Sequence, residues 1–245
     1  MKAITTIRSA IFWALLVISV IFSALFIFCA IPFTSQEWRY RFCSGWCRFT
    51  VKSLRLICGV QYEFENLQSV PKDKPVILLS KHQSAWETLA LTGFVPRRLS
   101  FVYKRELHRL PLFGQVLASL GMFSVDRARG RAAFAQMKEE VPEYFSKGWI
   151  LVLFPEGTRT APGQVIKYKS GGARVAIDTG VPVIPVALNS GEYWPRNSFC
   201  KYPGTIKVVF GPMISSENRT SQELNEEVQA WIENKMKELS PKYYR

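Results

Sequence analysis

The stretch that decides the fold is Pro75-Val76-Ile77-Leu78-Leu79-Ser80-Lys81-His82-Gln83-Ser84-Ala85-Trp86-Glu87. Its first part, a short apolar run that follows a proline, is typical of a buried strand in a parallel sheet. Its last part predicts the start of a helix, because Ser84 can cap a helix in which Glu87 reaches back to the cap. His82 is therefore expected in a turn from strand to helix, at the sheet edge where open α/β folds bind their ligands.

His82 is one of only two histidines in the chain, and a carboxylate, Glu87, follows it closely. An imidazole is a suitable general base near neutral pH, and Glu87 can accept its Nδ1–H bond so that Nε2 remains free as the base. The same residues also fit an ordinary helix start with a loop histidine. Ser84 beside His82 raises a third reading, a Ser–His hydrolase, but the chain has no Gly-x-Ser-x-Gly elbow.

Downstream of residue 75, apolar runs alternate with helical stretches. Strands are expected at residues 76–80, 99–103, 122–125, 149–154, 181–188 and 206–210. Helices are expected at residues 84–91, 112–120, 131–145, 172–179 and 221–239. This alternation predicts an α/β domain over residues 61–245, with a mostly parallel central sheet and helices on both faces.

The N-terminal part, residues 1–60, is expected to form membrane-associated helices. Residues 10–33 are almost wholly apolar, and a helix of that length, about 36 Å, is long enough to cross a hydrocarbon core. No small-x-small cleavage site follows, so the segment is expected to be retained. Residues 38–60 interleave basic and aromatic side chains, which is typical of a helix at a bilayer interface with its cations on lipid phosphates, although an amphipathic helix packed on the domain fits as well.

The formal net charge of +13 points to an anionic partner, which can be nucleic acid, a phospholipid surface or a phosphorylated substrate. The long apolar segment argues against nucleic acid. The excess of positive residues after this segment predicts that the following domain faces the cytoplasm. The five cysteines are odd in number and contain no CxxC pair, so they are expected to be reduced thiols, and no metal-binding cluster is visible.

Two further stretches carry side chains suited to binding phosphate. The first is Ile150-Leu151-Val152-Leu153-Phe154-Pro155-Glu156-Gly157-Thr158-Arg159, a buried strand followed by a tight turn. Gly157 lets the backbone approach a ligand and Arg159 can fork onto a phosphate, unless Arg159 simply pairs with Glu156. The second stretch consists of Lys104-Arg105-Glu106-Leu107 and Asp126-Arg127, which places cations at the ends of two strands or in a solvated basic loop.

Taken together, these motifs resemble the four ordered blocks of the glycerophospholipid acyltransferase family. The blocks are His82-x4-Glu87, Lys104–Leu107 with Asp126-Arg127, Phe154–Arg159, and Val181-Pro182-Val183-Ile184-Pro185-Val186-Ala187. The family's first block usually ends in Asp, where this chain has Glu87. The resemblance implies an αβ fold, a membrane-associated N-terminal part, and acyl transfer from acyl carrier protein or a coenzyme A thioester to a lysophospholipid hydroxyl, with no other cofactor.

The bacterial members of the family are the best match, which implies an inner (cytoplasmic) membrane location and lysophosphatidate, acylated at its free sn-2 hydroxyl to phosphatidate, as the substrate. By the same resemblance His82 and Glu87 would be catalytic, and the acceptor would be bound by Lys104, Arg105, Arg127, Glu156, Gly157, Thr158 and Arg159. Within that set the cations would hold the phosphate, while Glu156 and the turn around Gly157 would shape the glycerol site. Two alternatives stay open: another lysolipid acceptor, and a basic lipid-binding membrane module without catalysis.

Overall fold

The computed structural model describes residues 2–110, 112–126 and 131–244, without the side chains of Lys104 and of residues 131–134. The helices of this part of the chain are α1 (Lys2–Ala30), α2 (Gln36–Cys58), α3 (Trp86–Phe94), α4 (Phe113–Ser119), α5 (Arg131–Ser146), α6 (Gly171–Thr179) and α7 (Ser221–Leu239). Short 3-10 helices lie at η1 (Ile31–Phe33), η2 (Leu67–Ser69), η3 (Arg105–Arg109) and η5 (Ser190–Glu192). The strands are β1 (Val60–Glu65), β2 (Ile77–Ser80), β3 (Leu99–Lys104), β4 (Phe123–Val125), β5 (Ile150–Leu153), β6 (Val183–Leu188) and β7 (Gly204–Phe210).

These strands form one sheet in the order β1-β7-β6-β2-β5-β3-β4. Every neighbouring pair is parallel except β6 and β7, which run antiparallel. The predicted α/β fold with a mostly parallel sheet is therefore confirmed. The expected strands were found, but β1 was missed, because residues 60–65 were divided between the expected interfacial helix and a polar boundary. Its burial alternates along the strand, which is the period-two pattern of a half-covered edge strand.

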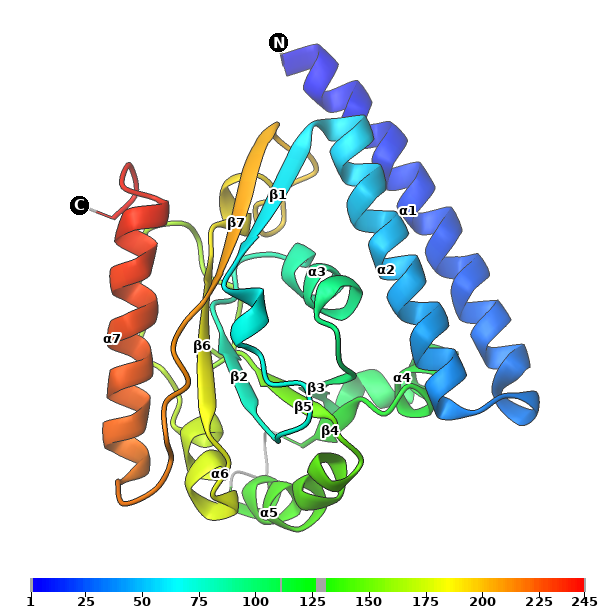
Figure 1. Ribbon diagram of the computed structural model, residues 1–245. Helices are drawn as coiled ribbons and strands as arrows, with labels where there is room; N and C mark the ends of the chain where they lie inside the picture. The colour runs from blue at the N-terminus through cyan, green and yellow to red at the C-terminus, as the bar shows by residue number, and fades with distance from the viewer. Residues whose placement is uncertain (1, 111, 127–130, 245) are drawn as a thin grey trace.

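Helices cover both faces of the sheet, with α5, α6 and α7 on one side and α3 and the α1–α2 pair on the other (Figure 1). The central strand β2 is buried along its whole length, as its unbroken apolar sequence predicts. Its side chains alternate between the two layers: Leu78 joins the core under α2 and α3, whereas Ile77 and Leu79 join the core under α6 and α7.

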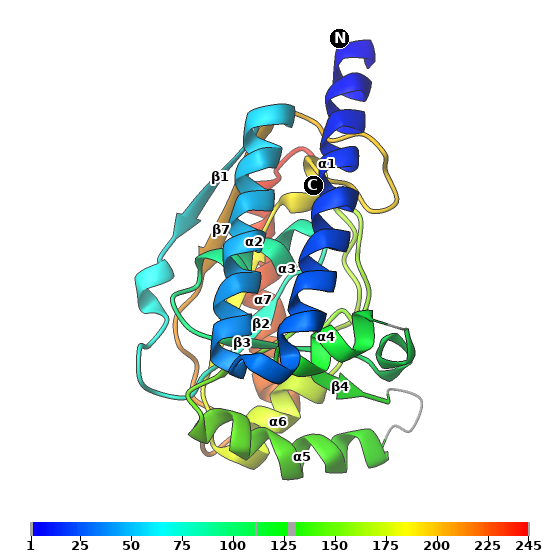
Figure 2. The ribbon, with the colours of Figure 1, turned by 90° about the vertical axis from the view of Figure 1, so that its right-hand side faces the viewer.

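Helices α1 and α2 form an antiparallel pair that lies against the α3 face (Figure 2). Together with η1, α1 is the one helix in the described part of the chain that is long and apolar enough to cross a membrane. Much of its outward surface is apolar and exposed; Phe22, for example, is 70% exposed. Its inward side is packed, because Phe12 is fully buried in the same core as Leu54 and Leu78. The boundary expected near residue 60 thus runs through a shared core.

Helix α2 combines both expectations for residues 38–60. One side packs on the domain through Val51 and Leu54, while Arg41 and Lys52 are exposed. Arg39 differs from the expectation that the cations of this segment face lipid: it is buried, and its guanidinium donates to the backbone carbonyls of Ile31, Thr34 and Ser119. The carbonyls of Ile31 and Thr34 lie where the chain reverses between α1 and α2, and that of Ser119 belongs to the last residue of α4, so Arg39 ties this reversal to α4.

Candidate active site

His82 lies in the turn after β2, as its sequence predicted, and the structure places β2 between β5 and β6 in the sheet. Its ring stacks on Phe154 at the end of β5, with 3.8 Å between the ring centroids and 14° between the planes. The main chain of His82 is held as well, since its carbonyl accepts a 2.8 Å hydrogen bond from the N–H of Thr160. The ring of His82 is therefore held by Phe154 and its main chain by Thr160.

Glu87 of α3 holds the imidazole from one side, with 2.8 Å between His82 Nδ1 and Glu87 Oε1. The carboxylate is fully buried. Oε1 also accepts from the N–H groups of Gln83 and Ser84, and Oε2 accepts from the hydroxyls of Ser84 and Ser190, each at 2.8 Å. Burial opposes ionisation of Glu87, but its contact with His82 and the donors of Ser84 hold the pKa of this carboxyl below its usual range. Glu87 is thus well suited to stabilise an imidazolium.

The helix start predicted at Ser84 is partly wrong. Helix α3 begins at Trp86, with Ala85 at its N-cap. Glu87 does reach back to the N–H of Ser84, as a capping box requires, but the Ser84 hydroxyl accepts from the N–H of Trp86 and donates to Glu87 instead of accepting from it. The Ser84 hydroxyl donates to Glu87 because a buried carboxylate needs hydrogen-bond donors. Ser84 is also only 1% exposed, which disfavours its use as a hydrolytic nucleophile.

A second carboxylate, Glu156, holds the His82 turn from the other side. Its Oε2 accepts the N–H of His82 at 2.6 Å, and its Oε1 lies 2.8 Å from the ammonium of Lys81 and accepts from the hydroxyl of Thr160 at 2.7 Å. Lys81 is fully buried and its ammonium also lies 2.8 Å from Glu233 of α7. An ion-pair network therefore connects the His82 turn to α7.

Glu156 and Lys81 of this buried network both have raised pKa values, which disfavours the charged form of the acid and favours that of the base. Burial raises the pKa of Glu156, while Glu156 and Glu233 outweigh burial and raise the pKa of Lys81. The charged form of Lys81 prevails at neutral pH, because two carboxylates lie within 2.8 Å of its ammonium. Glu156 had been expected to shape the glycerol site or to pair with Arg159. Instead it is 2% exposed and its carboxylate points into the domain.

A cavity of about 450 Å³ opens beside the His82 ring. Of the expected binding residues it contains Gly157, Thr158 and Arg159. Its other lining residues are Thr88, Phe101, Val102, Tyr103, Leu107, Phe154, Arg196 and Asn197. The structure therefore brings residues of the first and third sequence motifs together around one hollow, which is lined by two arginines as well as by aromatic and aliphatic residues.

The second motif is only partly located. The backbone of Lys104 ends β3, and Arg105 begins η3, where it is exposed and does not line the cavity. Arg127 lies outside the described residues. Sequence reasoning missed Lys81, Glu233 and Arg196. The position of Lys81 next to His82 was a visible signal, but the partners of Lys81 are remote in the sequence.

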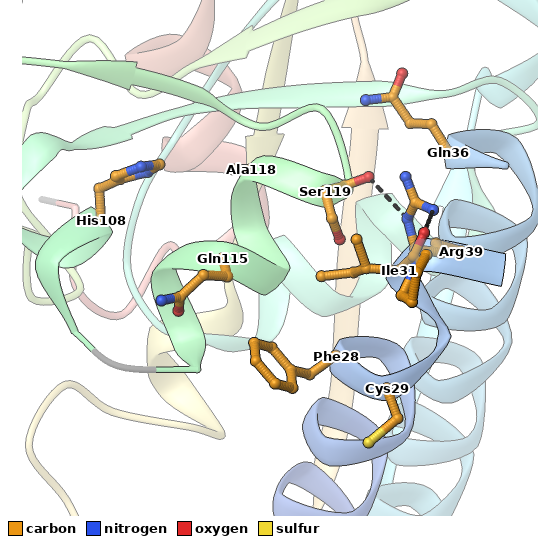
Figure 3. Close-up of a pocket in the computed structure, with 10 residues that line it drawn as sticks. Phe28, Cys29, Ile31, Gln36, Arg39, His108, Gln115, Ala118 and Ser119 are labelled. Carbon is orange, nitrogen blue, oxygen red and sulfur yellow. Dashed lines mark hydrogen bonds between the residues drawn. The ribbon is translucent and has the colours of Figure 1, made fainter. Parts of the chain in front are cut away.

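A larger hollow, about 840 Å³, lies where α1 ends and α2 begins (Figure 3). It is lined by the end of α1, by η1 and the start of α2, and by residues of η3 and α4, among them Phe28, Arg39 and Gln115. Neither His82 nor Glu87 lines it. The donors of Arg39 are directed to backbone carbonyls, as the dashed lines show (Figure 3). Size alone therefore does not select the candidate site, and the smaller cavity is the one that His82 lines.

Comparison with known proteins shows the family of the chain. Residues 61–189 match the Acyltransferase family. A 1-acyl-sn-glycerol-3-phosphate acyltransferase from Pseudomonas aeruginosa is 41% identical over 245 residues, which cover 98% of this chain and 95% of that protein. The chain belongs to the acyltransferase family. The resemblance inferred from the four motifs is thereby confirmed.

More distant members of the acyltransferase family share only part of the sequence. A 1-acyl-sn-glycerol-3-phosphate acyltransferase from Cocos nucifera is 27% identical over 154 residues, and the match spans half (50%) of that protein. The crystal structure of a 1-acyl-sn-glycerophosphate acyltransferase from Thermotoga maritima superposes with a TM-score of 0.79 and covers 97% of both chains, at 21% identity. At that identity the superposition supports the fold, including the N-terminal helices.

Proposed function

We propose that this protein transfers an acyl group from a thioester to the free sn-2 hydroxyl of 1-acyl-sn-glycerol 3-phosphate, giving phosphatidate. The names of its relatives support the acceptor. The observation that carries the proposal is the 2.8 Å contact between His82 and Glu87 beside a cavity that also contains Arg159. A base, a carboxylate that stabilises its protonated form, and a group that binds phosphate are what this transfer needs.

In the proposed reaction His82 Nε2 removes the proton of the acceptor hydroxyl as the oxygen attacks the thioester carbonyl carbon. A tetrahedral intermediate forms, and its collapse breaks the carbon–sulfur bond. The departing thiolate takes the proton back from the imidazolium, so the products are an ester and a free thiol. Glu87 stabilises the imidazolium in between, and stacking on Phe154 keeps the ring in place.

Arg159 is proposed to hold the acceptor phosphate, because a guanidinium can donate two parallel hydrogen bonds to phosphate oxygens. Gly157 enables the turn before it by adopting φ +70°, a conformation that favours glycine, and its N–H donates to the carbonyl of Phe154. The amide of Gly157 therefore shapes the turn. Lys104, Arg105 and Arg127 remain candidates for further contacts with either substrate.

The proposed donor is acyl carrier protein or a coenzyme A thioester, since both carry negative charge and suit a chain of net charge +13. The proposed partner surface is the cytoplasmic leaflet of the inner membrane. Helix α1 contacts the domain at two separate points along its length, through Phe12 with Trp194 and, near its C-terminal end, through Ile27 in a cluster with Val116. A helix fixed along the domain in this way is better placed to lie in one leaflet with its apolar outer side than to cross the bilayer.

The experiment is a steady-state assay of purified, detergent-dispersed protein. Lysophosphatidate and other lysolipids are offered with acyl carrier protein or coenzyme A thioesters, and both free thiol and product lipid are measured. We expect stoichiometric thiol and phosphatidate with lysophosphatidate. Thiol release only with a different lysolipid would reassign the acceptor, and lipid binding without thiol release from any donor would favour the non-catalytic module.

A further inference from the structure

The segment between β6 and β7 connects three parts of the molecule that the sequence motifs leave unlinked. At its start, the hydroxyl of Ser190 donates to the catalytic carboxylate of Glu87 at 2.8 Å. In its middle, Nη1 of Arg196 donates to the backbone carbonyl of Arg159 at 2.8 Å. At its end, the N–H of Lys201 donates to the hydroxyl of Ser9 in α1 at 2.8 Å. We call residues 189–203 the β6–β7 loop.

Helix α1 fixes the far end of the β6–β7 loop firmly. The indole N–H of Trp13 donates to the carbonyl of Phe199 at 2.9 Å. The ammonium of Lys201 lies 4.5 Å from the ring centroid of Trp13 and 5.0 Å from that of Trp194. Phe12 packs edge-on against Trp194, with 5.4 Å between the ring centroids. The loop position is thus set by the apolar helix on one side and by the catalytic turns on the other.

Arg196 is exposed and lines the cavity that also contains His82 and Arg159. Among the described residues that line this cavity there is no carboxylate. In the described ranges 2–110, 112–126 and 131–244, no ion pair joins Arg159 or Arg196 to an acidic side chain. Two guanidinium groups without acidic partners therefore share one hollow.

We propose that Arg196 is a second ligand of the acceptor phosphate and determines specificity for a phosphate monoester. The assignment rests on the proposed function. A phosphate monoester carries a charge of about −1.5 to −2 at neutral pH and presents three acceptor oxygens. One guanidinium fork covers two of them, so Arg159 leaves an oxygen and residual charge for a second cation. Arg196 is placed for this role by its hydrogen bond to the backbone of Arg159.

The test compares Arg196→Gln and Arg196→Lys with Arg219→Gln, which removes the same charge from an exposed ion pair with Glu227 outside the cavity. Acceptor and donor KM are measured with dispersed short-chain lysophosphatidate, and glycerol 3-phosphate is used as a soluble competitor. Arg196→Gln should raise the acceptor KM and the inhibition constant of glycerol 3-phosphate roughly tenfold, the order expected for one lost charged hydrogen bond at an exposed position. The donor KM and kcat should change little, Arg196→Lys should recover part of the loss, and Arg219→Gln should match the wild type.

The alternatives give different results. A rise in the donor KM alone would assign Arg196 to the phosphates of coenzyme A or to the acidic carrier protein, and would overturn the proposal. An unchanged acceptor KM in Arg196→Gln, with normal wild-type turnover of lysophosphatidate, would overturn the Arg196 assignment and leave the proposed function intact. A wild-type protein that does not acylate lysophosphatidate would overturn both.

Discussion

Two carboxylates hold the His82 turn, and they differ in what they bind. Glu87 contacts the imidazole itself, and its remaining donors come from the same turn and from Ser190. Glu156 contacts only the backbone N–H of His82 and is otherwise committed to Lys81 and Thr160. One carboxylate can therefore act on the proton that the imidazole carries, while the other fixes where the imidazole stands. Variants on each side of His82 should separate these two effects.

The largest expected effect is the loss of kcat when the His82 side chain is removed. His82→Ala should lower kcat by on the order of 10²–10⁴-fold, the usual contribution of a positioned general base. The fold should persist, because the contacts of His82 with Glu156 and Thr160 use backbone atoms that alanine retains. His108→Ala, the other histidine, is the matched control and should be fully active. Near-normal turnover by well-folded His82→Ala would remove His82 from the mechanism.

Variants in the ion-pair network of Glu156 should mainly lower the free energy of unfolding. Lys81→Ala leaves the buried carboxylates of Glu156 and Glu233 without their cation, and breaking a buried ion pair in this way costs about 3–5 kcal/mol of unfolding free energy. Chemical denaturation measures the loss. Lys207→Ala, which removes an exposed lysine 3.9 Å from Glu63, should change stability by less than about 1 kcal/mol. Equal, small losses in both variants would show that the Lys81 network does not stabilise the turn.

Replacing Glu87 should change both kcat and the dependence of stability on pH. Glu87→Gln keeps the size but removes the charge that stabilises the imidazolium, so kcat should fall by at least on the order of tenfold. Because the folded-state pKa of Glu87 is depressed, its contribution to stability is present above about pH 4.3 and is lost as the pH falls through the folded pKa. The stability gap between wild type and Glu87→Gln should therefore narrow on acidification. A stability difference that does not change with pH would mean that the charge of Glu87 does not stabilise the fold.

The same comparison shows what the sequence could predict. The contact of Glu87 with His82 follows from a short spacing across one strand-to-helix turn, and the strands follow from their apolar runs. The network around Glu156 could not be read in this way. Lys81 follows β2 and Glu156 follows β5, so the two meet only because these strands are neighbours in the sheet, and Glu233, the other partner of Lys81, lies far along the chain on α7. Local patterns define turns and strands, whereas burial of a charge depends on which distant elements the topology brings together.

The smallest expected effect concerns Arg159, which follows Glu156 in the same turn but lines the cavity while Glu156 points inward. Arg159→Lys keeps the charge and loses the bidentate fork, so about one net hydrogen bond, about 0.5–1.5 kcal/mol, should be lost. The acceptor KM should then rise roughly two- to tenfold, with the donor KM as an internal control. Stability should not change, because no acidic partner of Arg159 is found in the described ranges of the chain. If Arg159→Lys instead lowers stability and leaves both KM values unchanged, both residues of this turn are structural, and the phosphate must be held by other cations.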